Sequence, residues 1–132
     1  MKTDNVQLKF ANTFVGSMTS PSGQVVLGQQ PDGMAPYHLL YGAVGSCFYS
    51  TFLSIANKKR LSFQDAQLEV SGNKRDAIPA TLEYLKIEMT IRGGSDQAQL
   101  LSAAELGAKY CSIHETISKV AKIDLVVNFA SS

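Results

Sequence analysis

Cys47 and Cys111 are the residues of this chain best suited to covalent chemistry, and they are its only cysteines. A cysteine thiolate is a nucleophile that a peroxide oxidises to a sulfenic acid, and a second thiol converts that acid to a disulfide. Two cysteines make no disulfide scaffold, and a chain of 132 residues buries a core without one. In a reducing compartment the pair is therefore expected to form a transient, redox-active bond.

Two other uses of these cysteines remain open on the sequence. Free cysteine is a common small core residue, which is the plainest alternative for Cys47. Cys111 and His114 have the spacing of a zinc-ligand pair. His38 and Cys47, however, would face opposite sides of one helix at about 100° per residue, so a closed four-ligand site within one subunit is disfavoured. No nucleotide, flavin or haem signature is present, and we expect neither a metal nor a cofactor.

The composition is that of a globular protein with a formal net charge of +1. No basic stripe with interleaved aromatic residues is present, which argues against nucleic acid as a partner. The first ten residues contain no apolar signal core, so a cytoplasmic location is expected. Residues 35–56 carry no formal charge and precede Lys58-Lys59-Arg60, as in a membrane helix. Ser46, Ser50 and the lack of a second apolar span favour a buried helix and no membrane association instead.

Periodicity and turn residues place these cysteines in a single domain, 1–132. Alternation predicts strands, and Pro36 opens a long helix to about Lys59. Ser95 or Asp96 is expected to cap a second helix that runs to about Tyr110. The predicted strands cover 5–15, 23–29, 63–72, 81–91 and 123–129, and a short helix covers 112–121. This order indicates an α+β fold with a mostly antiparallel sheet.

The long helix carries Gly42, Ser46, Ser50 and Ser54 at intervals of four residues, which forms a stripe of small side chains. Such a stripe lets another helix approach closely. That helix belongs either to the same subunit or to a second copy of the chain, and the sequence leaves both open.

Both cysteines lie in motifs that resemble those of the OsmC/Ohr family. The run Ala35-Pro-Tyr-His-Leu-Leu-Tyr-Gly-Ala-Val-Gly-Ser-Cys47 is similar to that family's proline-led helix with a central cysteine. Cys111-Ser-Ile-His-Glu-Thr-Ile117 is similar to its second cysteine motif, typically C-P-V-S-x-T-L. The resemblance extends over nearly the whole chain.

This resemblance implies an OsmC-like fold: a mostly antiparallel sheet wrapped around a long buried central helix, within an intertwined homodimer. It also implies a thiol-dependent peroxidase that reduces organic hydroperoxides in oxidative-stress defence, with Cys47 and Cys111 as catalytic residues. Cys47 would attack the peroxide, Cys111 would form the disulfide, and an external dithiol would reduce it.

The sequence departs from this family at two activating positions, an arginine from the N-terminal strands and a glutamate ten residues before the first cysteine. No arginine precedes Arg60, and Tyr37 occupies the glutamate position. Unless Lys9 or a partner subunit substitutes, Cys47 is expected to be a slow nucleophile, because an ordinary thiol is mostly protonated at neutral pH. Cys111, at the start of a short helix that contains His114, is expected to be held more readily as thiolate.

The departure leaves a non-catalytic alternative. An OsmC-fold protein without these activating groups could bind a small apolar ligand at the dimer interface. Tyr41, Phe48, Phe52 and Tyr110 would then line the site, although core packing is the more common role of such residues.

Overall fold

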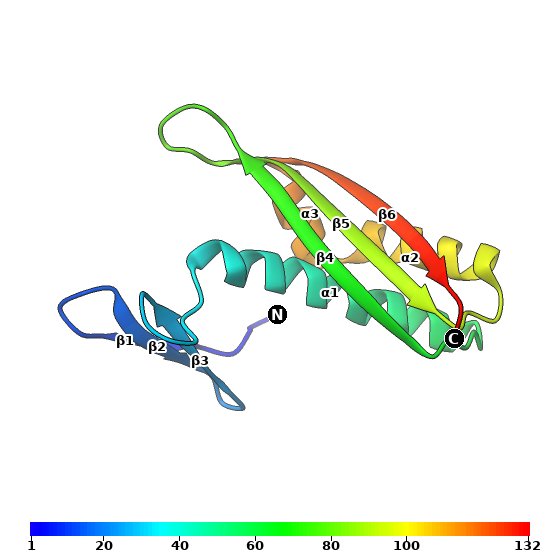
Figure 1. Ribbon diagram of the computed structural model, residues 1–132, viewed down its shortest axis with the longest axis horizontal. Helices are drawn as coiled ribbons and strands as arrows, with labels where there is room; N and C mark the ends of the chain where they lie inside the picture. The colour runs from blue at the N-terminus through cyan, green and yellow to red at the C-terminus, as the bar shows by residue number, and fades with distance from the viewer. The chain divides into compact units, whose positions relative to one another are not determined.

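The computed structural model describes residues 1–132, which divide into two compact units, 1–40 and 41–132. Six strands and three helices follow one another in the order β1-β2-β3-α1-β4-β5-α2-α3-β6 (Figure 1). The α+β class is confirmed. The single domain 1–132 stays a prediction.

The N-terminal unit is an antiparallel sheet in which β2 (Val15–Thr19) lies between β1 (Gln7–Phe10) and β3 (Gln24–Gly28). The single strand expected over 5–15 is wrong, because the chain reverses at residues 11–14, where the Ala11 amide donates to the Val15 carbonyl at 3.0 Å. Asn12 and Thr13 can support such a turn, so the glycine or proline that usually marks a turn in a sequence is absent. At the end of β3, Gly28 has a φ of +92°, which disfavours other residues.

The N-terminal unit leaves several large apolar side chains exposed to solvent. Leu8, Phe10 and Phe14 are 52%, 45% and 44% exposed, and the two phenyl rings stack with centroids 5.9 Å apart. Leu27 is the only buried apolar side chain of this unit. A contiguous apolar surface of this kind is typical of an interface.

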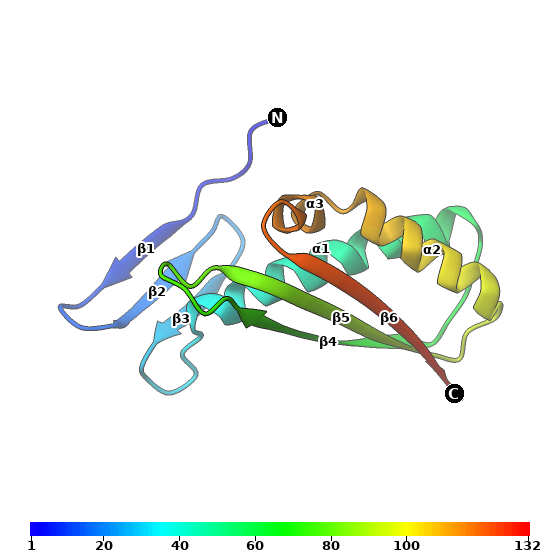
Figure 2. The ribbon, with the colours of Figure 1, turned by 90° about the horizontal axis from the view of Figure 1, so that it is seen from above.

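The C-terminal unit contains the core. Its sheet has the order β4 (Asp65–Lys74), β5 (Leu82–Arg92) and β6 (Lys122–Ala130), with β4 antiparallel and β6 parallel to β5. The helices α1 (Pro36–Lys58, within this unit from residue 41), α2 (Gln97–Tyr110) and α3 (Ser112–Ser118) lie on one side of the sheet (Figures 1 and 2). Alternation along β5 directs four fully buried side chains toward the helices: Leu85, Ile87, Met89 and Ile91.

Helix α1 presents one apolar edge to this core. Val44, Phe48, Phe52 and Ala56 recur every four residues and are fully buried. Helix α2 approaches this edge at Gly107, where a Cβ would lie only 3.1 Å from the Phe52 N and Cα atoms. This close contact fixes the register of α1 against α2, and hence the height of Cys47 relative to the end of α2.

The stripe of small residues lies on the other side of α1. Gly42, Ser46, Ser50 and Ser54 are all exposed, and a Cβ on Gly42 would find no neighbouring atom within 4 Å. No helix of the same chain packs on this stripe. Helix α1 is also long and apolar enough to cross a membrane. One such helix is weak evidence for a membrane span, because core helices pass the same test.

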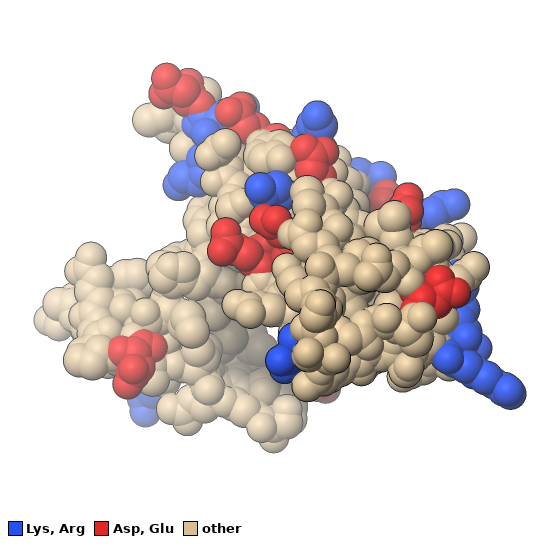
Figure 3. Space-filling model, turned by 45° about the vertical axis from the view of Figure 1, so that its right-hand side comes forward, with Lys and Arg blue, Asp and Glu red and all other residues tan.

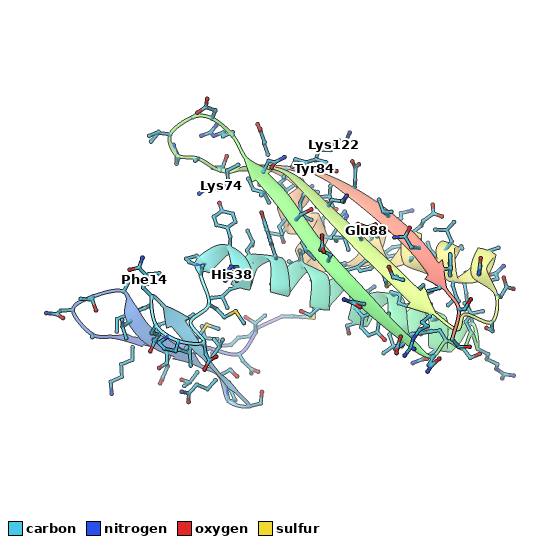
Figure 4. The ribbon with its side chains drawn as sticks, in the orientation of Figure 1. Phe14, His38, Lys74, Tyr84, Glu88 and Lys122 are labelled. Carbon is cyan, nitrogen blue, oxygen red and sulfur yellow. The ribbon has the colours of Figure 1, made fainter.

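The face of the sheet opposite the helices is polar. Tyr84 Oη donates to Asp124 Oδ2 at 2.9 Å, which raises the pKa of the tyrosine, and Asn128 Nδ2 donates to Glu88 Oε2 at 2.8 Å. Figure 4 shows Tyr84 and Glu88 along β5, with Lys122 near Tyr84 at one end of the sheet. Basic and acidic side chains are both scattered over the face of the molecule in Figure 3.

Candidate active site: a cysteine pair

The structure brings Cys47 and Cys111 together from opposite halves of the C-terminal unit. Cys47 lies in the middle of α1, next to the buried Phe48. Cys111 is the single residue between α2 and α3, ending the first helix and capping the second. The two thiols lie close enough that each shifts the pKa of the other: Cys111 lowers that of Cys47, and Cys47 raises that of Cys111. Two neighbouring thiols can form a disulfide once one of them is oxidised.

Cys111 is the buried member of the pair, with 0% of its surface exposed. Its Sγ accepts a hydrogen bond from the backbone N–H of His114 at 3.4 Å. Burial raises the pKa of Cys111, and its hydrogen bond to Cys47 raises it further, which together outweigh that amide. The expectation that Cys111 is held as thiolate is therefore wrong. Its position at a helix start provides backbone N–H donors from His114 and Ile113, but the surrounding apolar core disfavours the charge.

The pKa of Cys47 shifts in the opposite direction. It is half-buried, and burial alone would raise its pKa. Hydrogen bonds from the Cys111 side chain, the Ile113 backbone and Ser112 outweigh burial, so the net pKa of Cys47 is lowered. The missing arginine and glutamate led us to expect that Cys47 has no activating contact within its own chain. The structure differs, because hydrogen-bond donors at the start of α3 lower the pKa of Cys47.

Ser112 is the site residue that sequence reasoning missed. Its Oγ lies 4.0 Å from Cys47 Sγ, within reach of a hydrogen bond to the large sulfur atom. The only signal in the sequence was its position directly after Cys111. That signal could not identify Cys47 as its partner, because the contact joins residues 65 apart in the chain.

The two histidines have roles other than holding a thiolate. His114 contributes its backbone N–H to Cys111, whereas its ring lines a groove of about 470 Å³ with Glu105 and apolar side chains of α2 and β6. Burial lowers the pKa of that imidazole. His38 is exposed in the first turn of α1, where its Nδ1 accepts from the Ala35 amide at 2.9 Å (Figure 4). No group of three or more His, Cys, Asp or Glu side chains is placed to hold a metal ion.

The aromatic residues considered for a ligand site separate into two groups. Phe48 and Phe52 are fully buried, stack with centroids 6.4 Å apart, and belong to the core. Tyr110, by contrast, is 65% exposed and lies beneath the Lys109 ammonium. The suggestion that Phe48 and Phe52 line a ligand pocket is therefore wrong.

A family model described as OsmC-like protein matches residues 28–126, a span that contains both cysteines. This chain belongs to the OsmC-like family. It is 25% identical over 114 residues to protein YhfA of Escherichia coli K12, covering 84% of this chain and 85% of YhfA.

Solved structures agree with the fold. A hypothetical protein of Aquifex aeolicus superposes with a TM-score of 0.89 at 22% identity, covering 100% of this chain and 99% of that one. An organic hydroperoxide resistance protein OsmC of Legionella pneumophila superposes with a TM-score of 0.75 at 14% identity, covering 97% and 98%. The OsmC-like fold expected from the two cysteine motifs is confirmed.

Proposed function

We propose that this protein is a thiol-dependent peroxidase that reduces organic hydroperoxides through Cys47 and Cys111. One observation carries the proposal: the two thiols are neighbours, and their surroundings lower the pKa of the accessible one while raising that of the buried one. In such a mechanism the accessible thiol must ionise to attack the peroxide, whereas the resolving thiol can stay protonated until the first is oxidised. Membership of the OsmC-like family, and the name of the Legionella structural relative, favour a hydroperoxide as the oxidant.

In the proposed reaction the Cys47 thiolate attacks the terminal oxygen of the hydroperoxide. The O–O bond breaks, the alkoxide takes a proton and leaves as the alcohol, and Cys47 becomes a sulfenic acid. The Cys111 sulfur then attacks the oxidised sulfur, forming the disulfide and releasing water. An external dithiol restores both thiols by exchange. No metal or organic cofactor takes part in these steps.

The proposal is tested by counting free thiols in the reduced protein before and after one equivalent of an organic hydroperoxide. Wild type is expected to lose both thiols within seconds to minutes, and a dithiol is expected to restore them. If both thiols survive excess hydroperoxide, the peroxidase is disproved. The chain would then be a member of the family that has lost this chemistry, and ligand binding would become the function to examine.

We propose further that the working form is an intertwined cytoplasmic homodimer. Two surfaces support association of two copies: the open apolar side chains of the β1–β3 sheet, and the exposed small-residue stripe of α1. Exposure of the apolar side chains to water is unfavourable, and the small stripe allows the matching stripe of a second copy to approach closely.

Ser50→Leu should weaken this dimer, because the larger side chain keeps the two α1 stripes apart. The expected result is a shift toward monomer in light scattering after size exclusion, with a dissociation constant raised roughly 10-fold or more, as for about 1.4 kcal/mol. Ala98→Leu is the matched control, since Ala98 is exposed on α2 away from the stripe. A wild-type monomer at micromolar concentration, or equal masses for both variants, would argue against the proposed interface.

A further inference from the structure

Hydrogen-bond donors to Cys47 come from a residue with no assigned part in the chemistry. We propose that Ser112 is a catalytic residue that holds Cys47 as the thiolate, its hydroxyl hydrogen-bonded to the Cys47 sulfur. The consequence for peroxide reduction rests on the proposed function, but the thiolate itself can be measured without any peroxide.

The geometry that supports this role is local and specific. Ser112 Oγ lies 4.0 Å from Cys47 Sγ, within reach of a hydrogen bond to a sulfur atom. The Ser112 side chain is exposed, and its hydroxyl makes no other hydrogen bond. It is therefore free to rotate its proton toward a negative sulfur.

The alternatives within the C-terminal unit are weaker. Cys111 also lowers the pKa of Cys47, but its thiol proton is lost when Cys111 attacks the sulfenic acid. Ser112 keeps its proton throughout the cycle, so it can stabilise Cys47 as the attacking thiolate and again as the leaving thiolate when the disulfide is reduced. A hydrogen bond to an ionised group is stronger than one between neutral groups.

The backbone of Ser112 adds to the same effect. Its amide is among the groups that lower the pKa of Cys47, alongside its hydroxyl. Ser112 is the first residue of α3, a position where proline is tolerated because no intrahelical bond uses that amide. Two substitutions therefore separate the contributions: Ser112→Ala removes the hydroxyl alone, and Ser112→Pro removes both donors without breaking the helix.

The experiment measures the pH dependence of iodoacetamide alkylation of Cys47 in the reduced protein, with the modified cysteine identified by mass spectrometry. Alkylation slows as pH falls through the pKa of the thiol. Ser112→Ala is expected to raise the midpoint by about half to one pH unit, and Ser112→Pro to raise it further. Ser112→Thr, which keeps a hydroxyl, should restore the wild-type midpoint.

Thr116→Ala is the matched control, because it removes an exposed α3 hydroxyl that bonds only to the Ser112 carbonyl, at 3.0 Å. Its midpoint should equal that of wild type. An unchanged midpoint in Ser112→Ala with circular dichroism like that of wild type would overturn the role of the hydroxyl, as would an equal rise in Thr116→Ala. If the midpoint rises in a protein that consumes no hydroperoxide, the role of Ser112 stands and the proposed peroxidase fails.

Discussion

Cys47→Ser is expected to abolish hydroperoxide consumption, with a loss on the order of 10³-fold or more in turnover. A serine hydroxyl in this position stays protonated at neutral pH, because Cys111 and Ser112 can lower the pKa of a thiol but not bring that of an alcohol into range. The measurement is loss of an organic hydroperoxide with time in the presence of a dithiol, followed by a peroxide-specific dye.

Cys111→Ser distinguishes the two roles. This variant is expected to consume about one equivalent of hydroperoxide per subunit and then to accumulate a sulfenic acid, which dimedone traps at Cys47. Burial of Cys111 is the reason, since a protonated thiol enclosed by the core reacts with its neighbour and not with a dissolved peroxide. The assignment would be reversed if Cys47→Ser retained the first equivalent and Cys111→Ser lost it.

The second large effect concerns the contact that sets the site. Phe52→Ala is expected to lower the free energy of unfolding by about 3–5 kcal/mol, because a fully buried ring would leave a cavity that its neighbours cannot fill. Phe52 packs its ring against Phe48 and Phe63, with centroids 6.4 and 5.7 Å away, and its backbone against Gly107. Denaturant unfolding at one fixed protein concentration measures the change.

Leu101→Ala is the control for Phe52→Ala. Leu101 is also apolar but is 40% exposed on α2, so its truncation should cost about 1 kcal/mol or less. Equal losses for the two variants would show that the α1–α2 contact is not the centre of this core. In a domain whose total stability is typically about 5–15 kcal/mol, the loss predicted for Phe52→Ala is a large share of the whole.

Secondary structure was predictable where the periodicity and the cap residues agree. The alternation of Leu82 to Ile91 predicted β5, and Pro36 marked the first residue of α1. Asp96 caps α2 as expected, accepting from the Gln99 amide at 3.1 Å. The turn between β1 and β2 was missed, because neither glycine nor proline marks residues 11–14 and apolar residues continue on both sides of it.

The candidate site was predictable in its cysteines but not in its electrostatics. The motifs around Cys47 and Cys111 identified both residues, since the chain has no other thiol. Which thiol is the more acidic depends on burial and on donors from distant residues, and neither follows from spacing along the chain. Reasoning from the start of α3 therefore favoured Cys111, whereas the core around it reverses that preference.

Residue types and local periodicity were thus enough to predict the elements from α1 onward, the pair of thiols and the family motifs that contain them. The burial of Cys111, the accessibility of Cys47 and the contact of Ser112 with the Cys47 sulfur follow instead from how the helices pack. They depend on the close approach of α1 and α2 at Gly107 and Phe52. That contact joins residues far apart in the chain, and it determines where along α1 the start of α3 lies.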